Sequence, residues 1–177
     1  MIWHYTPATH LSLIVNDGII KVSTVDFPQR EQQAVWFSSN TVFEHTSATL
    51  ARRTKNGLEE LPPTRFGYGR IGIDEADAPH NFDEYLRQSK LPNHMRDHLI
   101  DRAEAVNAKP SEWYATFKPV PKEKWKRIEL LWNHNWVGIR LAAEHNLGQI
   151  IAQCIKAWSQ GREVAIVQPP QAGRNSG

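Results

Sequence analysis

The chain lacks the features that mark several classes of protein. Only one of its 177 residues is a cysteine, Cys154, which excludes an internal disulfide framework and a zinc site built from several cysteines. No apolar run reaches the length that crosses a bilayer, and residues 1–4 do not begin a basic segment followed by an apolar one. We therefore expect a cytoplasmic protein without a membrane segment or an export signal.

The sequence also lacks a large net charge, a phosphate-binding loop and a metal-ligand cluster. The formal net charge is only +2, which argues against a general nucleic-acid-binding surface, although a pI of about 8.7 leaves room for a local basic patch. The sequence has neither a Gly-x-Ser-x-Gly elbow nor a Gly-rich phosphate loop. His94 and His98 have helical i, i+4 spacing, but no third ligand accompanies them, and we predict no metal site.

Apolar and aromatic residues are abundant. The chain is 40% hydrophobic and 23% charged, with seven tryptophans, which is typical of a globular domain with a substantial core. We predict one domain over residues 1–167, with a core pattern in 2–131, an added helix and strand in 141–167, and a flexible tail in 168–177. An apolar helical stripe from Leu147 to Trp158 makes Cys154 a core residue and not a nucleophile.

Strand and helix signals are interspersed along the chain without regular alternation. Thr6-Pro7 predicts a helix start, Asn16-Asp17-Gly18 its end, and Asn81 with Glu84 a capping box. The predicted strands are 2–5, 19–22, 34–39, 65–73, a run after Glu112, 125–132 and 136–139; the predicted helices are 7–16, 81–89 and 92–106, with 23–33 a loop and 41–53 partly helical. This order predicts an α+β fold with a mixed or antiparallel split sheet and flanking helices.

The polar residues best placed for chemistry lie at or near strand ends: His4, Ser38, Arg70 and Glu112. Glu112 directly precedes an aromatic run, so its carboxylate can lie beside a cleft, where it could orient a hydroxyl or stabilise a cationic transition state. The alternative is a solvated acid at a strand end. The ring of His4 could donate to a ligand hydroxyl, and the helix N-terminus after Thr6 could face an anion.

Three short motifs occur in an order that resembles the ADP-ribosyltransferase superfamily. These are IWHYT at 2–6, AVWFSS at 34–39 and EWYA at 112–115. The last is similar to the glutamate-aromatic strand of the poly(ADP-ribose) polymerase branch. The resemblance covers about residues 2–131 and implies an ADP-ribosyltransferase-like fold. Many relatives have glycine after the histidine, where this chain has Tyr5.

The resemblance also implies NAD as the substrate and a role for each matched residue. His4 would bind the adenosine ribose, Ser38 would support the nicotinamide side, and backbone groups at Tyr5 would hold the carboxamide. Glu112 would orient the nicotinamide ribose and stabilise an oxocarbenium-like transition state. Arg70, or a lysine near Pro119, would neutralise the pyrophosphate. Phe43, Trp36 and Tyr5 all remain candidates for stacking on nicotinamide.

The predicted function is therefore that of an NAD-dependent ADP-ribosyltransferase, which cleaves the nicotinamide-ribose bond and transfers ADP-ribose. The sequence does not identify the acceptor, which could be protein, nucleic acid, a small molecule or water, nor the oligomeric state. One alternative is a non-enzymatic binding module with an aromatic recognition surface. Another alternative is a nucleic-acid enzyme that resembles the RNA 2′-phosphotransferases. Its substrate would need several basic residues around the cleft, and the candidates are Arg52, Arg53, Arg65 and Arg70.

Overall fold

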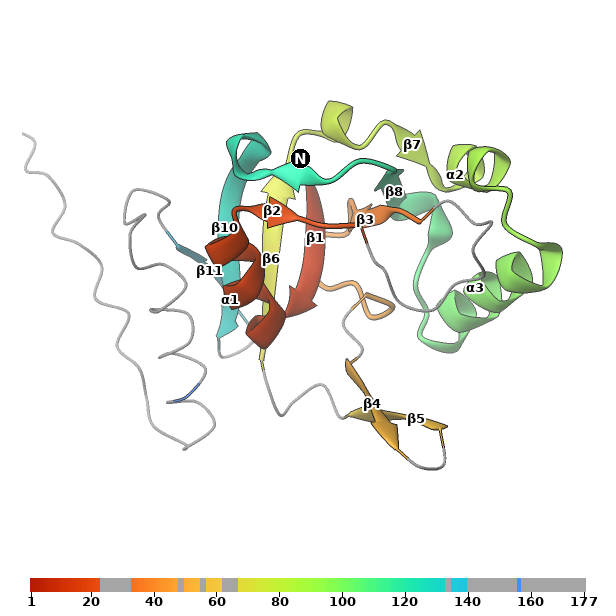
Figure 1. The fold of residues 1–177 in the computed structure, drawn as a ribbon, viewed down its shortest axis with the longest axis horizontal. Helices are drawn as coiled ribbons and strands as arrows, with labels where there is room; N and C mark the ends of the chain where they lie inside the picture. Colours follow the sequence, from red (N-terminus) through yellow and green to blue (C-terminus); the bar gives the residue numbers. More distant parts are fainter. Residues whose placement is uncertain are drawn as a thin grey trace, which may run out of the picture.

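A seven-stranded sheet organises the chain in the computed structural model (Figure 1). The structure describes residues 1–22, 33–47, 50–54, 57–61, 67–132, 135–139 and 156. The strands of the sheet are β1 (Ile2–Pro7), β3 (Val35–Ser38), β6 (Tyr68–Ile73), β7 (His80–Asn81), β8 (Trp113–Thr116), β10 (Trp125–Trp132) and β11 (Asn135–Ile139). Their order is β11-β10-β6-β1-β3-β8-β7, and each neighbouring pair is antiparallel.

Shorter elements complete the described fold. Two small ladders join β2 (Ile19–Ile20) to β9 (Val120–Pro121) and β4 (Leu50–Thr54) to β5 (Gly57–Leu61). The helices are α1 (Ala8–Asp17), α2 (Phe82–Ser89) and α3 (Asn93–Ala105), and three single turns of 3-10 helix are η2 (Glu75–Asp77), η3 (Pro110–Glu112) and η4 (Lys122–Lys124). The α+β class and the mostly antiparallel sheet are thus confirmed. None of the described helices has the length and apolar character needed to cross a membrane.

The helix boundaries follow from local chemistry. Gly18 ends α1 in the left-handed conformation (φ 68°), and its N–H donates to the Ile14 carbonyl. Asn81 accepts from the Glu84 N–H, and Glu84 accepts in return from the Asn81 N–H, so the predicted capping box opens α2. These contacts satisfy backbone groups that have no partner inside a helix.

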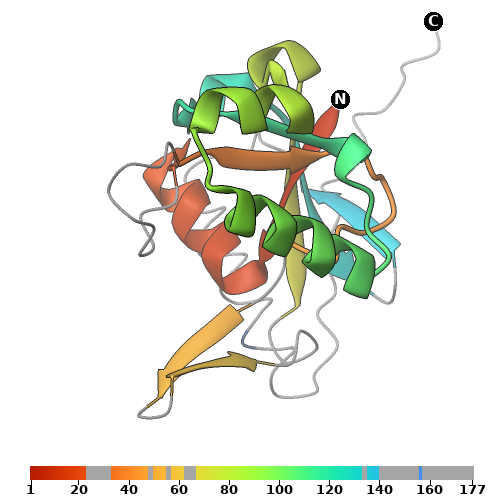
Figure 2. The same ribbon diagram turned by 90° about the vertical axis from the view of Figure 1, so that its right-hand side faces the viewer.

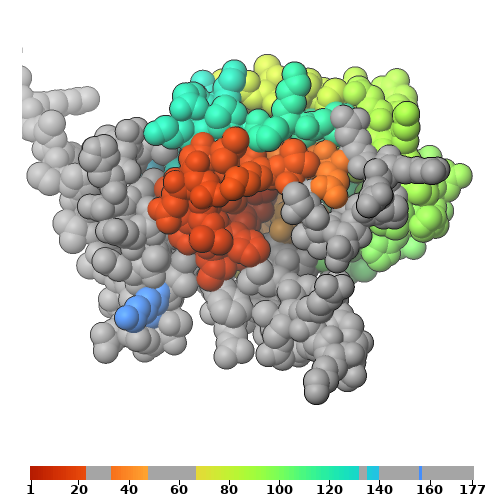
Figure 3. All heavy atoms as spheres, in the orientation of Figure 1, coloured from red at the N-terminus to blue at the C-terminus, as the bar shows by residue number. Residues whose placement is uncertain are grey.

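One face of the sheet packs against α1. Because side chains alternate along a strand, every second residue of the central strands points to this face. Gly69 lies under Leu11, which allows α1 to approach the sheet closely. The buried residues of this core include Ile2, Ala8, Leu11, Ile20, Val35, Phe37, Ile71, Ile73, Val120, Ile128 and Leu130. The surface around α1 adjoins that of the segment containing β9 (Figure 3), where the Lys122 N–H donates to the Gly18 carbonyl.

The other face of β3 and β8 packs against α2 and α3 (Figure 2). Trp36 and Phe37 are adjacent in β3 and therefore point to opposite faces. Trp36 contacts Tyr85 of α2 and Trp113 of β8, with ring centroids 4.3 Å and 6.2 Å away. This second cluster holds β3 and β8 in place against the two helices.

The junction between β1 and β3 has the fewest residue pairs in the sheet. A single residue pair, Trp3 with Ser38, joins these strands, whereas six pairs join β1 to β6. Beyond this pair the backbones of β1 and β3 no longer pair, and the sheet is split there.

The prediction of partial helix for residues 41–53 is wrong. Residues 41–47 form bends and turns, and Leu50–Thr54 is β4. The Asn40 side chain accepts from the N–H groups of Val42 and Phe43, and the Glu44 side chain accepts from the Thr46 N–H. Side-chain acceptors therefore bind the donors that a helix would use.

Several further predictions concern residues that the structure does not describe. The loop at 23–32, the helical stripe containing Cys154, the strand at 164–167 and the tail at 168–177 all lie outside the described residues.

Candidate functional site

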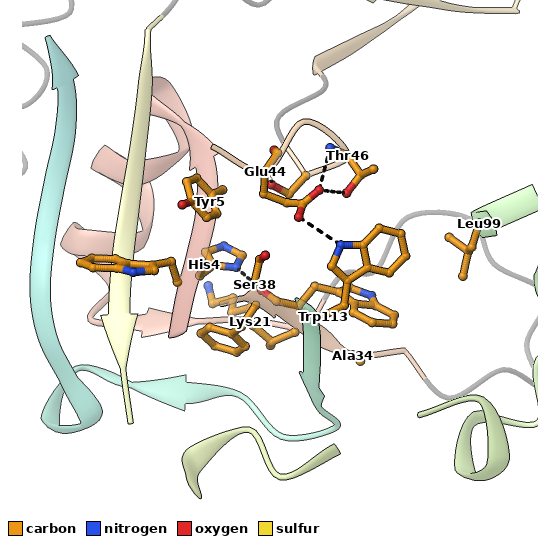
Figure 4. Close-up of a pocket in the computed structure, with 14 residues that line it drawn as sticks. His4, Tyr5, Lys21, Ala34, Ser38, Glu44, Thr46, Leu99 and Trp113 are labelled. Atoms are coloured by element: carbon orange, nitrogen blue, oxygen red, sulfur yellow. Dashed lines mark hydrogen bonds between the residues drawn. The ribbon is translucent and has the colours of Figure 1, made fainter. Parts of the chain in front are cut away.

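A cavity of about 270 Å³ lies at the split between β1 and β3 (Figure 4). Its wall is formed by Trp3, His4 and Tyr5 of β1, residues 34–38, Glu44, Thr46 and Ser47 of the following loop, Trp113 of β8, Lys21 and Leu99. The lining is mostly aromatic and apolar with a few polar atoms, which is typical of a ligand pocket.

His4 inserts its side chain where the two strands separate. Its Nδ1 lies 2.9 Å from the Trp36 carbonyl oxygen, and because a carbonyl only accepts, Nδ1 carries the proton. Burial lowers the pKa of His4, an effect that outweighs the raising effect of this hydrogen bond, and nearby His10 lowers it further. The ring is therefore neutral at pH 7, and its Nε2 is a hydrogen-bond acceptor.

Ser38 and Tyr5 lie beside His4 but differ in the hydrogen-bonding groups that they present to the cavity. Ser38 is almost fully buried at the end of β3, and its Oγ accepts from the Asn40 N–H at 3.1 Å, which leaves the hydroxyl hydrogen to donate. The hydroxyl of Tyr5 donates to the Asn40 carbonyl and accepts from Arg70, and burial raises its pKa. Tyr5 therefore presents its ring and backbone to the cavity, while its hydroxyl is already bonded.

Glu44 is a residue of the wall that the sequence analysis does not predict, as are Lys21, Thr46 and Ser47. Its side chain is buried, with an exposed fraction of 3% for the residue. Oε1 accepts from the backbone N–H and the hydroxyl of Thr46 at 3.2 and 2.6 Å, and Oε2 accepts from the Trp113 indole N–H at 3.0 Å. Figure 4 shows the carboxylate reaching from its loop toward Trp113. The only signal in the sequence is the run of short polar residues after β3, which favours side-chain-capped turns.

Glu112 lies beside the cavity and not in its wall. It is the last residue of η3, and its carbonyl accepts from the Ser39 N–H at 2.8 Å, while the next residue, Trp113, lines the cavity. Its carboxylate is 3.8 Å from the Lys109 ammonium, and its side chain is 28% exposed.

The register explains why these predicted residues meet. Trp3 pairs with Ser38, and Ser38 pairs with Trp113, so His4 on β1, Ser38 on β3 and Glu112 just before β8 lie at nearly the same level of the sheet. The structure therefore brings the three residues to one region, with two in the wall and Glu112 at its edge.

Arg70 and Thr6 do not line the cavity. Arg70 is buried, and its guanidinium donates to Glu129 at 2.6 Å, to the Tyr5 hydroxyl at 3.0 Å and to the Thr41 carbonyl at 2.6 Å. It also lies 3.9 Å and 4.2 Å from the ring centroids of Trp3 and Trp136. Contrary to the expectation from its strand position, this arginine is held inside the fold and is not presented to a pyrophosphate.

The predicted anion site at the start of α1 is also occupied by the protein. Thr6 is buried, and the first helical N–H, that of Ala8, donates to the Gly67 carbonyl at 3.1 Å. The cation in the wall is instead Lys21, a mostly exposed side chain whose ammonium lies 2.6 Å from Asp17.

Of the three candidate stacking aromatics, Tyr5 and Trp36 line the cavity, and Phe43 does not. Phe43 packs instead against Tyr5, Tyr68 and Trp136.

Comparison with protein-family models, with curated proteins and with solved structures gives no match to this chain. The resemblance to the ADP-ribosyltransferases therefore stays a prediction. The described residues contain no group of three side chains placed to hold a metal ion. The cavity instead combines aromatic walls with two acceptors, His4 Nε2 and Glu44 Oε2, and two donors, the Ser38 hydroxyl and the Trp3 indole N–H, which is buried without a partner among the described residues.

Proposed function

We propose that this protein binds NAD at the split between β1 and β3, cleaves the nicotinamide-ribose bond and transfers ADP-ribose to an acceptor. The observation that carries the proposal is the convergence of His4 and Ser38 on one cavity, with Glu112 at the start of the next strand. The same three residues are those to which the resemblance assigns roles.

The chemistry requires a negative charge near the ribose. When the bond between C1′ and the nicotinamide nitrogen breaks, its electron pair leaves with nicotinamide, and positive charge develops on the ribose. A carboxylate beside that ribose stabilises the transition state more than the ground state. Water or another acceptor hydroxyl then bonds to C1′ and releases a proton to solvent.

The Glu112 carboxylate is held only weakly in its present position. Its ion pair with Lys109 is long, at 3.8 Å, and largely exposed, so it holds the carboxylate only weakly. The proposed role requires a change of side-chain rotamer that turns the carboxylate from Lys109 toward the cavity.

The size of the cavity limits which part of NAD it encloses. Its volume of about 270 Å³ lies just below the range of about 300–1,000 Å³ that is usual for ligand pockets. It therefore suits one ring with its attached group, while the rest of the dinucleotide extends over the rim. There Lys21 supplies the cation for the pyrophosphate, because Arg70 is bonded to Glu129 inside the fold.

Glu112→Gln tests the proposal because it keeps the shape of the side chain and removes its charge. We expect NAD affinity to change little and nicotinamide release at saturating NAD to fall by about 100-fold or more, as for loss of one preorganised electrostatic contact. Glu104→Gln, an exposed change on α3, is the matched control, and melting curves check that both variants are folded. Equal rates for wild type and Glu112→Gln would remove Glu112 from catalysis.

A non-enzymatic binding module is the second candidate, and the position of Glu112 outside the cavity wall favours it. In that case the aromatic wall recognises a ligand without transforming it. NAD would then raise the melting temperature, but no nicotinamide would be released with any acceptor.

A further inference from the structure

Glu44 is a buried acid in the cavity wall for which the proposed chemistry has no use. Oε1 accepts two hydrogen bonds from Thr46, whereas Oε2 accepts one, from the Trp113 indole. An ionised carboxylate offers about four acceptor positions. Among the described residues, one acceptor position of Oε2 therefore has no donor, and this carboxylate borders the cavity.

Other polar groups of the wall define what else a ligand must satisfy. His4 Nε2 is an acceptor, because Nδ1 holds the proton against the Trp36 carbonyl. The Ser38 hydroxyl can donate, because its oxygen already accepts from Asn40. The Trp3 indole N–H, on another lining residue, is buried without a partner among the described residues. The wall therefore supplies two acceptors and two donors, and a complementary ligand carries N–H or O–H donors close to acceptors.

The walls restrict the ligand further. The rings of Trp3, Trp36, Phe37 and Trp113 surround these polar atoms, and a flat ring makes the best contact with such walls. A negative charge next to Glu44 would be repelled in a poorly solvated space. A planar ring with an N–H2 group suits both conditions, and a planar ring with a carboxylate does not.

We propose that Glu44 is a specificity-determining residue that accepts a hydrogen bond from the amino or amide N–H2 group of a planar ring. The cavity then takes the N–H2 form of a ligand and rejects its carboxylate or carbonyl counterpart. In NAD both the carboxamide of nicotinamide and the exocyclic amine of adenine have this chemistry. The identification of NAD rests on the function proposed above; the selectivity rests on the contacts of Glu44, His4 and Ser38.

Matched ligand pairs measure this selectivity directly by calorimetry. Nicotinamide is compared with nicotinic acid, and adenosine with inosine. The same changes within the dinucleotide compare NAD with its nicotinic acid and hypoxanthine analogues. We expect the N–H2 form to bind wild type at least about 10-fold more tightly in one pair, because its counterpart leaves a buried acceptor unpaired. The selective pair identifies the end of NAD that enters the cavity.

Glu44→Gln tests whether this residue is the cause. The amide oxygen of glutamine can accept from Thr46, which turns its N–H2 group toward the position of Oε2 and replaces an acceptor with a donor. We expect the preference for the N–H2 form to vanish or reverse in this variant, whereas Glu104→Gln on α3 retains it. If Glu44→Gln fails to fold, the wild-type measurements still decide whether the cavity selects the N–H2 form.

Three results would overturn the proposal: equal affinities within both pairs for wild type, an unchanged preference in folded Glu44→Gln, or no binding of any of these ligands at millimolar concentration. The outcome is separable from the proposed function. Nicotinamide release without selectivity at this site would disprove the role of Glu44 and still support the enzymatic function. Selectivity without nicotinamide release would leave a binding site and remove the enzyme.

Discussion

At the scale of single residues, the candidate site was partly predictable. His4, Ser38 and Glu112 are each polar and lie at or near the end of an apolar strand, which predicts that they take part in a site, and all three lie in one region. Arg70 fitted the same rule and yet is internal, because Glu129 lies directly opposite it on β10. A sequence gives no register between strands that are 59 residues apart. Glu44 was missed because turns set by side-chain hydrogen bonds have no hydrophobic period.

His4 should make stability depend on pH. Its pKa in the folded protein lies below the unfolded value of about 6.5 because burial disfavours the charged ring. The unfolded chain therefore binds more protons in this range. The stabilisation is complete above about pH 6.5 and is lost as the pH falls through the folded pKa, by at most about 1.4 kcal/mol per pH unit.

Denaturant titrations at pH 5 to 8 measure this effect. His4→Gln does not titrate and retains an N–H for the Trp36 carbonyl, so its stability should vary less over the same range. Asp74, whose pKa is lowered chiefly by its hydrogen bond to Lys126, titrates below this window and does not confuse the comparison. Identical pH slopes for wild type and variant would contradict the prediction.

The Arg70–Glu129 pair provides a second test at this scale. Arg70→Met removes the cation that lies against a carboxylate buried to 2% exposure, and Arg127, 2.6 Å from the other oxygen, compensates only in part. We expect a loss of about 3–5 kcal/mol in the free energy of unfolding. The double change Arg70→Met/Glu129→Leu should recover most of this loss, since no buried charge remains, and urea denaturation measures both variants. Equal losses in the single and double variants would show that the shape of Arg70 matters more than its charge.

At the scale of elements, prediction succeeded where the signal is local. The capping box at Asn81 and the stop at Gly18 depend on neighbouring residues, and both are confirmed. The bounds of helices moved by only one residue or so: the helix expected at 7–16 is Ala8–Asp17. The pairing of β3 with β8 depends on contacts between distant segments, which local patterns do not encode.

Gly69 tests how closely α1 packs on the sheet. A Cβ at this position would lie 2.3 Å from Leu11 Cδ2 and 3.3 Å from the Glu129 carbonyl oxygen, so Gly69→Ala forces the helix or the strand to shift. We expect a destabilisation of about 1–3 kcal/mol, as for other overpacked sites. Gly138→Ala on β11 is the control, because its Cβ would meet only the Arg127 side chain, at 3.4 Å. Similar melting temperatures for both variants would mean that α1 moves aside freely.

At the scale of the whole molecule, the split of the sheet creates the cavity. The β1–β3 junction has one residue pair, and the His4 side chain contacts the β3 backbone beyond it. Interspersed strands and helices predicted the α+β class, but the place of the split depends on how α1 and the α2–α3 pair cover opposite faces. That arrangement depends on packing between distant segments. Residues of the site could therefore be predicted from the sequence, but the position of the cavity could not.

Filling the cavity separates its role in binding from its role in folding. Ala34 is buried, lines the cavity and also packs in one core cluster with Tyr85 and Ala115, so Ala34→Leu should narrow the cavity at a cost of about 1–3 kcal/mol. Ala115, fully buried on neighbouring β8 and outside the wall, is the control, because Ala115→Leu overpacks a filled core and should cost about 1–3 kcal/mol. At 100 times its dissociation constant, NAD should stabilise wild type by about 2.7 kcal/mol, and Ala34→Leu should lose most of that gain. If NAD raises the melting temperatures of Ala34→Leu and wild type equally, the ligand binds elsewhere on the protein.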